Sequence, residues 1–441
     1  MTRIALFTLA AASLLPGAWK AGAAAEKITP GESIWLAGYA ARTRPSESVR
    51  QDIYAKALAL EDGTGALSVL VTLDLIGIRR TLAEPIADAV AGRHKIPRER
   101  ILFNASHTHS GPLIGDPSNY EPQMGAAYEA HARTVANYTA WLKERILAVI
   151  DKAIAARQPA TLTFGQGFAG FAVNRRRVGH RDYPGPVDHD VPVLLVKGAV
   201  GKPAAVAFGY ACHNTVMGDY TIHGDYAGYA QQEIERRYPG AVALFVQGAG
   251  ADSNPLPRRK PEQLLRYGTT LADAVEEVIA GSMSVVEGTL SAAIEFPEVR
   301  FAPHTRDEFE QKAKSGSNSE RRHAQRQLKE LDRNGKFLEN YPYPVQGWRF
   351  ATGPTLLALG GELVVDYALR LKQKYGWDTT WVAGYSNDVF GYVPSLRVLR
   401  EGGYEGGEAF LGGIFPGAFA PDIEERILSG VDRVAQRLGR R

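Results

Sequence analysis

The sequence has 441 residues, of which 45% are hydrophobic and 22% are charged. These fractions are ordinary for a soluble globular protein with a sizeable core, and the length allows one large α/β domain or roughly two or three smaller ones. The formal net charge is only +3, which argues against nucleic acid as a partner, because binding it requires many phosphate contacts from Lys and Arg. Cys212 is the one cysteine of the sequence, so no intramolecular disulfide can form.

The N-terminus has the pattern of a secretory signal peptide. Arg3 supplies a positive charge, residues 4–15 form an apolar run, and residues 23–25 are small alanines of the kind that precede a cleavage site. The apolar run is shorter than the roughly 20 residues that a membrane-spanning helix requires. We therefore expect residues 1–25 to be a signal peptide, the protein to be secreted or periplasmic, and residues 26–441 to form the functional domain.

Beyond this segment, apolar strand patterns alternate with helical patterns. Strands are expected at 67–75, 101–106, 192–197, 204–211 and 241–247, and helices at 80–94, 126–156, 227–237 and 261–281. The charged segment 305–336 predicts a solvated helical hairpin, after which the chain returns to a strand, a Gly-Gly turn and a helix. Such alternation is typical of α/β architecture. Because neither an internal repeat nor a Pro/Ser-rich linker divides the chain, we expect a single large domain with a mixed β-sheet core flanked by helices.

Two of the ten histidines lie two positions apart, directly after the expected strand 101–106. Residues i and i+2 of a strand share a face, about 6.6 Å apart. His107 and His109 would therefore project to the same side of a sheet edge, where α/β proteins build their sites. Imidazole is the commonest metal ligand. The same segment is also compatible with a nucleophile at Ser106 or Ser110, or with a polar turn, so spacing alone leaves the three interpretations open.

Three further segments place polar residues after apolar runs. His213 follows one expected strand, Asp252 lies in the glycine-rich turn after another, and Glu362 follows two glycines. Asp225 and Asp252 could instead cap turns or helices, and Cys212 could be a metal ligand or a small buried filler. Taken together, these residues fit a metal-hydrolase pocket, which needs about three protein ligands and one open position for water.

The sequence resembles the neutral/alkaline non-lysosomal ceramidases in a series of segments that occur in the family's order. These segments are NASHTHSGP, CHNTVMGDYTIHGDYAGYA, FVQGAGADSNP, GGEL and GYSNDVFGYVPS followed by YEGGE. The resemblance extends over roughly residues 30–415, the family's N-terminal amidase domain, and its His-Thr-His-Ser-Gly-Pro part is the most specific. It implies a zinc amidase that cleaves the N-acyl bond of ceramide into sphingosine and a fatty acid.

The resemblance also implies roles for individual residues. Carried over by motif, the ligands of Zn²⁺ are His107, His213, Glu362 and Tyr392. His109 would face the substrate and help to stabilise the reacting carbonyl, and Arg175 in the segment GFAVNRRR would contact the substrate. Zinc lowers the pKa of a bound water from ~15.7 to ~7, and a base that the sequence does not identify must take the proton.

Two departures from the family pattern bear on mechanism and substrate. If Pro255 aligns with the proline of the family's serine turn, Asn254 stands where that serine is expected and Ser253 lies one residue earlier. This favours a zinc-activated water over a serine nucleophile. The family's C-terminal immunoglobulin-like domain is not recognisable after the amidase motifs, which weakens the case for ceramide itself more than the case for amidase chemistry.

The sequence therefore predicts an exported zinc-dependent amidohydrolase that acts on ceramide or a related N-acyl lipid, with transient contact with a membrane surface. One alternative is a zinc hydrolase of a smaller soluble amide or ester. Another is a non-catalytic binding protein on the same scaffold. The presence of four ligand candidates together with His109 argues against the second alternative, because a binding protein would not need that full set.

Overall fold

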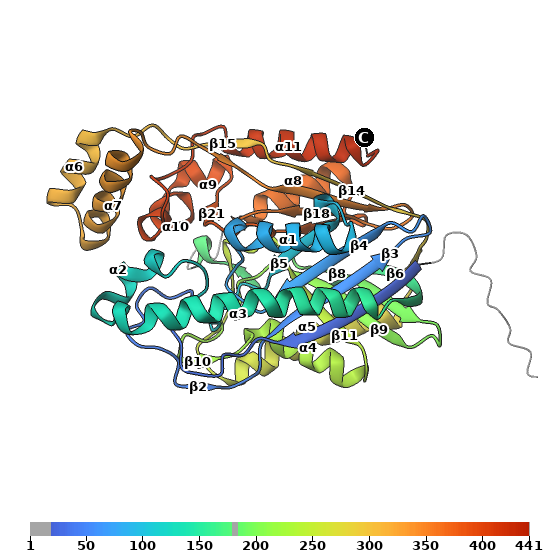
Figure 1. The fold of residues 1–441 in the computed structure, drawn as a ribbon. Helices are drawn as coiled ribbons and strands as arrows, with labels where there is room; N and C mark the ends of the chain where they lie inside the picture. Colours follow the sequence, from blue (N-terminus) through green and yellow to red (C-terminus); the bar gives the residue numbers. More distant parts are fainter. Residues whose placement is uncertain (1–18, 179–183, 441) are drawn as a thin grey trace, which may run out of the picture.

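The largest element of the fold is a nine-stranded mixed sheet, seen in the computed structural model, which describes residues 19–178 and 184–440 (Figure 1). The strands follow the order β11 (Val242–Gln247), β9 (Pro203–Tyr210), β8 (Asp190–Gly198), β6 (Gln158–Phe168), β1 (Trp19–Lys27), β3 (Tyr54–Glu61), β4 (Leu67–Leu73) and β5 (Ile101–Ala105), with β13 (Ser284–Val286) paired to β6. β11 pairs with β9 and β4 with β5 in parallel, and the other pairs are antiparallel.

A second sheet packs against one face of the first. Its four strands follow the order β14 (Leu290–Glu295), β17 (Val345–Phe350), β18 (Thr355–Leu359) and β20 (Thr380–Ala383). One apolar cluster fills the space between the sheets, with Leu58, Leu70 and Leu194 from the first and Trp348 and Trp381 from the second. Because β4 is buried on both faces, its sequence LSVLVTL is nearly continuous in apolar residues instead of alternating.

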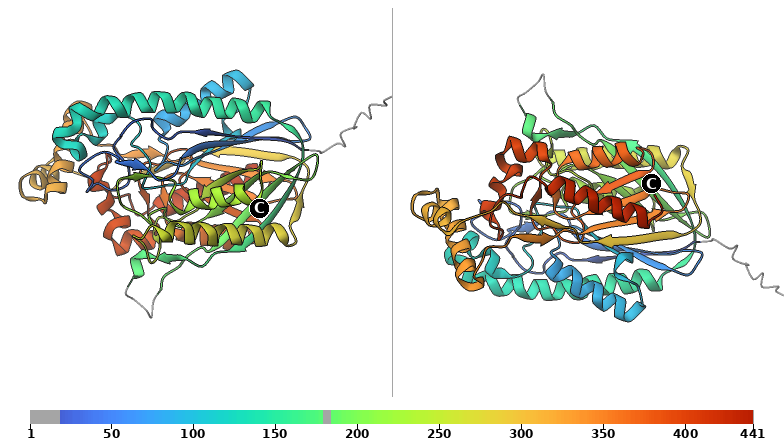
Figure 2. Two further views of the ribbon diagram at one scale, coloured as in Figure 1. Left: turned by 90° about the horizontal axis from the view of Figure 1, so that it is seen from below. Right: turned by 90° about the horizontal axis from the view of Figure 1, so that it is seen from above.

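Helices cover the outer faces of both sheets, so the chain forms four layers (Figures 1 and 2). α1 (Arg80–His94) and α3 (Tyr128–Ala155) cover β3, β4 and β5, α4 (Asp225–Arg237) and α5 (Glu262–Ala280) cover β8, β9 and β11, and α8 (Val365–Tyr375) and α11 (Ile423–Arg437) cover the second sheet. Within the described ranges, none of the helices combines the length and the apolarity that a membrane-spanning segment needs.

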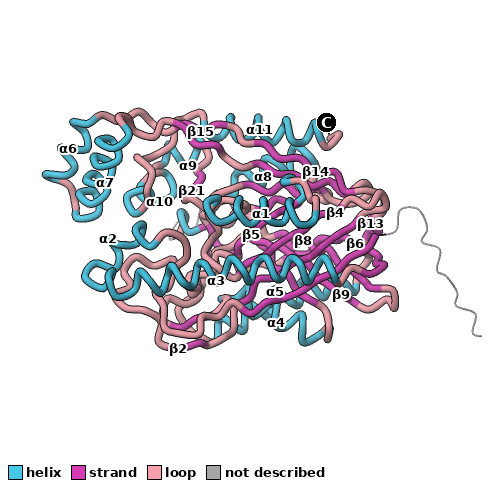
Figure 3. Tube along the Cα trace, viewed as in Figure 1, coloured by secondary structure: helices cyan, strands magenta, loops and turns pink. Residues whose placement is uncertain are grey.

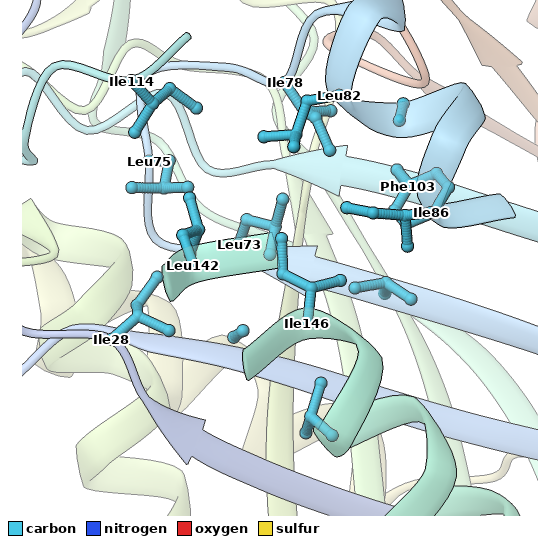
Figure 4. Packing of buried hydrophobic residues seen from close by; sticks show 14 of the residues in the cluster. Ile28, Leu73, Leu75, Ile78, Leu82, Ile86, Phe103, Ile114, Leu142 and Ile146 are labelled. Atoms are coloured by element: carbon cyan, nitrogen blue, oxygen red, sulfur yellow. The ribbon is translucent and has the colours of Figure 1, made fainter. Parts of the chain in front are cut away.

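The packing under α3 shows how the helical pattern produces a buried stripe. Leu142 and Ile146, four positions apart, point from α3 toward Leu73 of β4, and Phe103 of β5 meets α1 in the same cluster (Figure 4). Residues at this spacing lie on one helix face. Each fully buried side chain of this size contributes about 1.5–3 kcal/mol relative to an exposed one.

Shorter elements connect the layers and carry the loops around the site (Figure 3). The helices are α2 (Glu121–Met124), α6 (Arg306–Ser315), α7 (Asn318–Asn334), α9 (Leu396–Glu401) and α10 (Gly403–Gly406). The strand pairs are β2 (Ser48–Val49) with β10 (Thr221–Ile222), β7 (Ala172–Asn174) with β12 (Ser253–Pro255), β15 (Glu298–Arg300) with β16 (Asn340–Pro342), and β19 (Glu362–Leu363) with β21 (Tyr392–Val393). α6 and α7 form the expected charged hairpin and project from one end of the molecule (Figure 1).

The expected fold class, a mixed α/β sheet core flanked by helices, is confirmed. The helix expected at 80–94 is α1, the one expected at 126–156 is α3, and the strand expected at 101–106 is β5. Two features were not expected from the sequence. The later strands form a sheet of their own, and most of strand β1 overlaps the segment interpreted as a signal peptide.

Strand β1 is incompatible with cleavage after Ala25. It pairs along its length with β3 and at its start with β6, the indole Nε1 of Trp19 donates to the carbonyl of Val286 over 2.8 Å, and Gly22 lies directly under the backbone of α3. Removal of residues 1–25 would take away most of a strand inside the sheet and leave the edges of β3 and β6 that face it without their hydrogen-bond partners. This pairing argues for an earlier end of any signal peptide, and the boundary expected at residue 25 stays a prediction. The rest of the expected signal peptide, residues 1–18, lies outside the described residues.

Candidate metal centre and adjoining pocket

The polar segments that follow β5, β9 and β11 meet at one place, and buried Asn104 joins them. Its side-chain amide donates to the carbonyl of Gly384 at 2.8 Å, and its Oδ1 accepts from the backbone N–H of Gln247 at 2.7 Å. These bonds tie the end of β5 to the end of β11 and to the loop after β20. The structure thus brings together the strand ends that carry the candidate residues, and Asn104 is a contributor that sequence reasoning missed.

The imidazole rings of His107 and His213 are each held by a backbone carbonyl group. Nδ1 of His107 lies 2.6 Å from the carbonyl oxygen of Ile76, and Nδ1 of His213 lies 2.7 Å from that of Gly250. Because a carbonyl oxygen only accepts, each Nδ1 carries a hydrogen, and in a neutral ring the lone pair is then on Nε2. Burial lowers the pKa of His213 to about 4, so this ring is neutral at pH 7 and its Nε2 is free to bind a metal.

Glu362 and Tyr392 reach the same point from the parallel strands β19 and β21, in which they are direct partners. Oε2 of Glu362 lies 3.2 Å from Nε2 of His107 and 3.4 Å from Nε2 of His213. The hydroxyl of Tyr392 lies 3.3 Å from Nε2 of His213. Gly361 makes this approach possible, since it has φ +70° and a Cβ there would lie 2.5 Å from Val393.

These atoms form a donor set that fits a metal ion. Among the described residues, Oε2 of Glu362 has no hydrogen-bond partner, although two imidazole nitrogens face it. Electron-rich atoms in such proximity repel one another unless a cation lies between them. Two imidazoles, a carboxylate and a phenol oxygen are compatible with a metal site. The rings of His107, His109 and His213 also lie close enough for all three to offer nitrogen to one ion.

His109 differs from the other two histidines. Its Nε2 lies 3.1 Å from Nε2 of His107, but its Nδ1 has no hydrogen-bond partner among the described residues. Its ring packs against Tyr39, with ring centroids 4.9 Å apart, and against Gly38, where a Cβ would lie only 2.4 Å from the imidazole. Burial, reinforced by the neighbouring histidines, lowers the pKa of His109 well below its ordinary value. The ring is therefore neutral and held by packing instead of by a carbonyl.

Tyr385 is a second residue of the site that sequence reasoning missed. Its ring lies 4.5 Å from that of His107, between centroids, and its hydroxyl is buried without a hydrogen-bond partner among the described residues. Burial raises the pKa of Tyr385 well above its ordinary value, so the phenol keeps its hydrogen. The signal available in the sequence was its position in the GYSN segment, two residues before Asn387.

Arg175 connects the candidate centre to an open pocket of about 590 Å³. It donates to the Tyr392 hydroxyl at 3.1 Å and forms an ion pair with Glu405 at 2.6 Å. The pocket is lined by Arg175 and by Tyr404, whose ring lies 5.2 Å from that of Tyr392. A cavity of this volume lies within the usual range of small-molecule sites, and it opens directly beside the candidate ligands.

The remaining candidates have structural roles. The carboxylate of Asp225 accepts the backbone N–H groups of Val216, in the loop after β9, and of Tyr226 in α4. That of Asp252 accepts the N–H of Val365, the first residue of α8. Both carboxylates thus bind backbone groups, but neither belongs to the N-cap residue of its helix. Cys212 is buried in an apolar cluster, and burial raises its pKa well above the ordinary value. Ser253 lies in β12, and its hydroxyl is buried without a partner among the described residues.

Comparisons with known proteins agree on the class. The model of the family "Neutral/alkaline non-lysosomal ceramidase, N-terminal" matches residues 19–302. A solved structure titled "Ceramidase complexed with C2" superposes with a TM-score of 0.74 and 18% identity, covering 96% of this chain and 76% of the other. The neutral ceramidase from Pseudomonas aeruginosa superposes with a TM-score of 0.73 and 20% identity, covering 96% and 75%. No curated protein matches the sequence.

The family match thus places the chain among the hydrolases of the ceramidase class. Because the family model spans more than half of the sequence, the chain belongs to the neutral/alkaline non-lysosomal ceramidase family. The resemblance inferred from the motifs is confirmed, and the family match begins at Trp19, the first residue of β1.

Proposed function

We propose that this protein is an exported zinc-dependent amidase that cleaves the N-acyl bond of ceramide or a related N-acyl lipid. The observation that carries the proposal is the convergence of Nε2 of His107, Nε2 of His213 and Oε2 of Glu362 within 3.4 Å, with the Tyr392 hydroxyl beside them. Zn²⁺ suits this set, because it accepts imidazole and carboxylate ligands and its coordination can expand from four to five when a water or substrate joins.

Each neighbouring residue has a defined task in this proposal. Bound zinc supplies a water of lowered pKa and polarises the amide oxygen. Neutral His109 lies beside His107 and stabilises the charge that develops on the reacting carbonyl. Arg175 orients the Tyr392 hydroxyl and contacts the substrate from the pocket side.

A serine nucleophile is less well supported. A serine needs a base within hydrogen-bond reach to become reactive, and the hydroxyl of Ser253 has no partner among the described residues. Asn254, at the position where the family's serine is expected, accepts a hydrogen bond from Thr215 instead. Both observations favour a water nucleophile.

A substrate panel tests the reaction. The zinc-loaded protein is incubated with ceramides, N-acyl amino acids and simple esters that share one acyl chain, and the released fatty acid is measured. We expect amide hydrolysis that is lost in His109→Ala, while His94→Ala, a change at a peripheral histidine paired with Asp151, leaves the rate unchanged. Activity confined to the simple esters would overturn the amidase proposal in favour of the smaller-substrate alternative.

Export and contact with a membrane surface belong to the same proposal. They rest on the apolar run at residues 4–15 and on the lipid nature of the expected substrate. Fractionation of cells that express the full chain provides the test. Recovery of the protein only from the cytoplasm would contradict export, and equal hydrolysis of dispersed and vesicle-bound substrate would contradict a role for the membrane surface.

A further inference from the structure

Five of the eleven residues that line the pocket beside Tyr392 are charged, and most of these five pair with other charged side chains. Glu405 binds Arg175 and Arg176 at 2.6 Å each, and Glu401 binds Arg176 at 3.1 Å and Arg177 at 2.6 Å. Both carboxylates are therefore already paired with arginine side chains of the protein itself. An alkyl chain gains little from burial against such charges, because they retain water.

Arg258 is the exception. Its side chain lines the same pocket and is half-buried, yet within residues 19–178 and 184–440 no hydrogen bond or ion pair involves its guanidinium. Burial and the neighbouring charge of Arg259 lower the pKa of Arg258, and Arg175 acts on it in the same direction. A half-buried cation among like charges is unfavourable unless an anion binds to it.

The position of Arg258 places that anion near the reacting bond. Arg258 lines the pocket together with Arg175, and its chain neighbour Arg259 donates to the hydroxyl of Tyr39 at 3.0 Å. Arg175 contacts Tyr392, and the ring of Tyr39 packs on His109. An anionic group bound by Arg258 would thus lie close to the candidate centre. The acyl part of an N-acyl lipid is hydrocarbon, so an anion at this distance belongs to the amine part.

We propose that Arg258 binds an anionic group on the amine side of the scissile amide, so that among the N-acyl lipids of the proposed function the N-acyl amino acids are hydrolysed in preference to neutral amides such as ceramide. This inference rests on the proposed amidase function. Arg258 acts as a specificity residue, because a guanidinium forms two parallel hydrogen bonds with a carboxylate. The free-energy cost of half-burying the Arg258 guanidinium is offset only when such a substrate is bound.

Two matched substrates test the inference. N-dodecanoylglycine and N-dodecanoylethanolamine share the acyl chain and the amide. The first carries a carboxylate on its amine part, and the second carries a hydroxyl group there. For the zinc-loaded full chain, we expect Arg258→Gln to lower kcat/KM for the glycine amide by about tenfold or more, the effect of losing a charged hydrogen bond. The ethanolamide should change less than twofold, and Arg258→Lys should restore part of the loss. Arg333→Gln, at an exposed arginine of α7, is the charge-matched control.

A binding measurement distinguishes failure of this inference from failure of the proposed amidase function, because it does not depend on hydrolysis. The sulfonamide analogues N-(dodecylsulfonyl)glycine and N-(dodecylsulfonyl)ethanolamine resist hydrolysis, so calorimetry reports their affinity for wild type and Arg258→Gln without turnover. Tighter binding of the glycine analogue that disappears in Arg258→Gln supports the inference even if no amide is cleaved, in which case only the amidase function fails. Equal affinity of wild type for both analogues, or equal loss of both in the variant, overturns the inference.

Discussion

The guanidinium of Arg175 donates a hydrogen bond to the hydroxyl of Tyr392 across 3.1 Å, and that hydroxyl lies 3.3 Å from Nε2 of His213. Arg175 is itself fixed by Glu405 at 2.6 Å. A partly buried cation thus orients the phenol oxygen that faces the candidate metal centre, and the same side chain forms part of the pocket wall. The pocket and the centre are therefore coupled through one hydrogen bond.

This coupling predicts non-additive effects of substitution. Arg175→Gln and Tyr392→Phe should each lower kcat/KM for amide hydrolysis by about ten- to a hundredfold, since each removes a charge-assisted hydrogen bond in a buried site. The double variant should be little worse than Tyr392→Phe alone, because both changes break one interaction. Steady-state rates of the zinc-loaded proteins provide the measurement. Fully additive losses would show that the two residues act separately.

Zinc content should follow the assigned ligands. We expect about one zinc per chain in the wild type and strongly reduced zinc in His107→Ala, His213→Ala and Glu362→Gln. His109→Ala should keep its zinc, because no carbonyl fixes Nδ1 of His109 as the other two histidines are fixed. Elemental analysis of dialysed protein is the measurement, with His94→Ala as control. A wild type without zinc, or loss of zinc in His109→Ala alone, would contradict the ligand assignment.

Gly38 should control the position of His109. A Cβ at Gly38 would lie 2.4 Å from the imidazole, so Gly38→Ala must displace the ring. We expect a loss of activity of about tenfold or more with zinc content unchanged. Gly65→Ala is a matched control, because Gly65 also has positive φ but has no atoms near its Cβ position. Both variants should lose about 1 kcal/mol of stability from backbone strain, and only Gly38→Ala should lose activity.

Asp252 should make stability depend on pH. Burial raises the pKa of Asp252 from 3.8 to about 6. Between these values the folded chain holds a proton that the unfolded chain has released, so this group lowers stability as pH rises from about 4 to 6. The free energy of unfolding should fall by an amount on the order of 3 kcal/mol over this interval, at about 1.36 kcal/mol per pKa unit.

In Asp252→Asn this decline should be absent, since an amide does not titrate. Urea unfolding at pH 4 and pH 7 gives the comparison, and the wild type should lose more stability than the variant over this interval. The variant also weakens the bonds from Val365 and Asn174, which shifts its stability at both pH values. The difference between the two pH values is therefore the decisive quantity, and an unchanged difference would contradict the raised pKa.

Strand β1 fixes where a signal peptide can end. A chain that begins at Trp19 should fold with the stability of the full sequence, whereas a chain that begins at Glu26 should aggregate, because most of one edge of β3 would be left without hydrogen-bond partners. Thermal unfolding and gel filtration of the two truncations test this expectation. Mass spectrometry of exported protein should find any cleavage before Trp19. A soluble, active chain that begins at Glu26 would show that β1 is dispensable.

The alanine-rich segment 19–27 shows the limit of local pattern reading. Small residues at positions 23–25 satisfy the requirement of a cleavage site and also those of a strand that lies under α3, where Gly22 has no room for a side chain. Only the pairing with β3 and β6 distinguishes the two, and that pairing joins residues far apart in the chain.

The sequence by itself determined the main helices and strands, because burial of both faces leaves a continuous apolar run in strands such as β4 and burial of one face leaves a periodic apolar pattern in α3. It also supplied His107, His213, Glu362 and Tyr392 through their motifs. Only the tertiary structure decided that the later strands form a separate sheet, that Nδ1 of both metal-site histidines donates to carbonyls, and that Arg258 has no partner among the described residues. The physical reason is that hydrogen bonds and ion pairs at the site join segments from opposite ends of the chain, and local periodicity carries no information about such contacts.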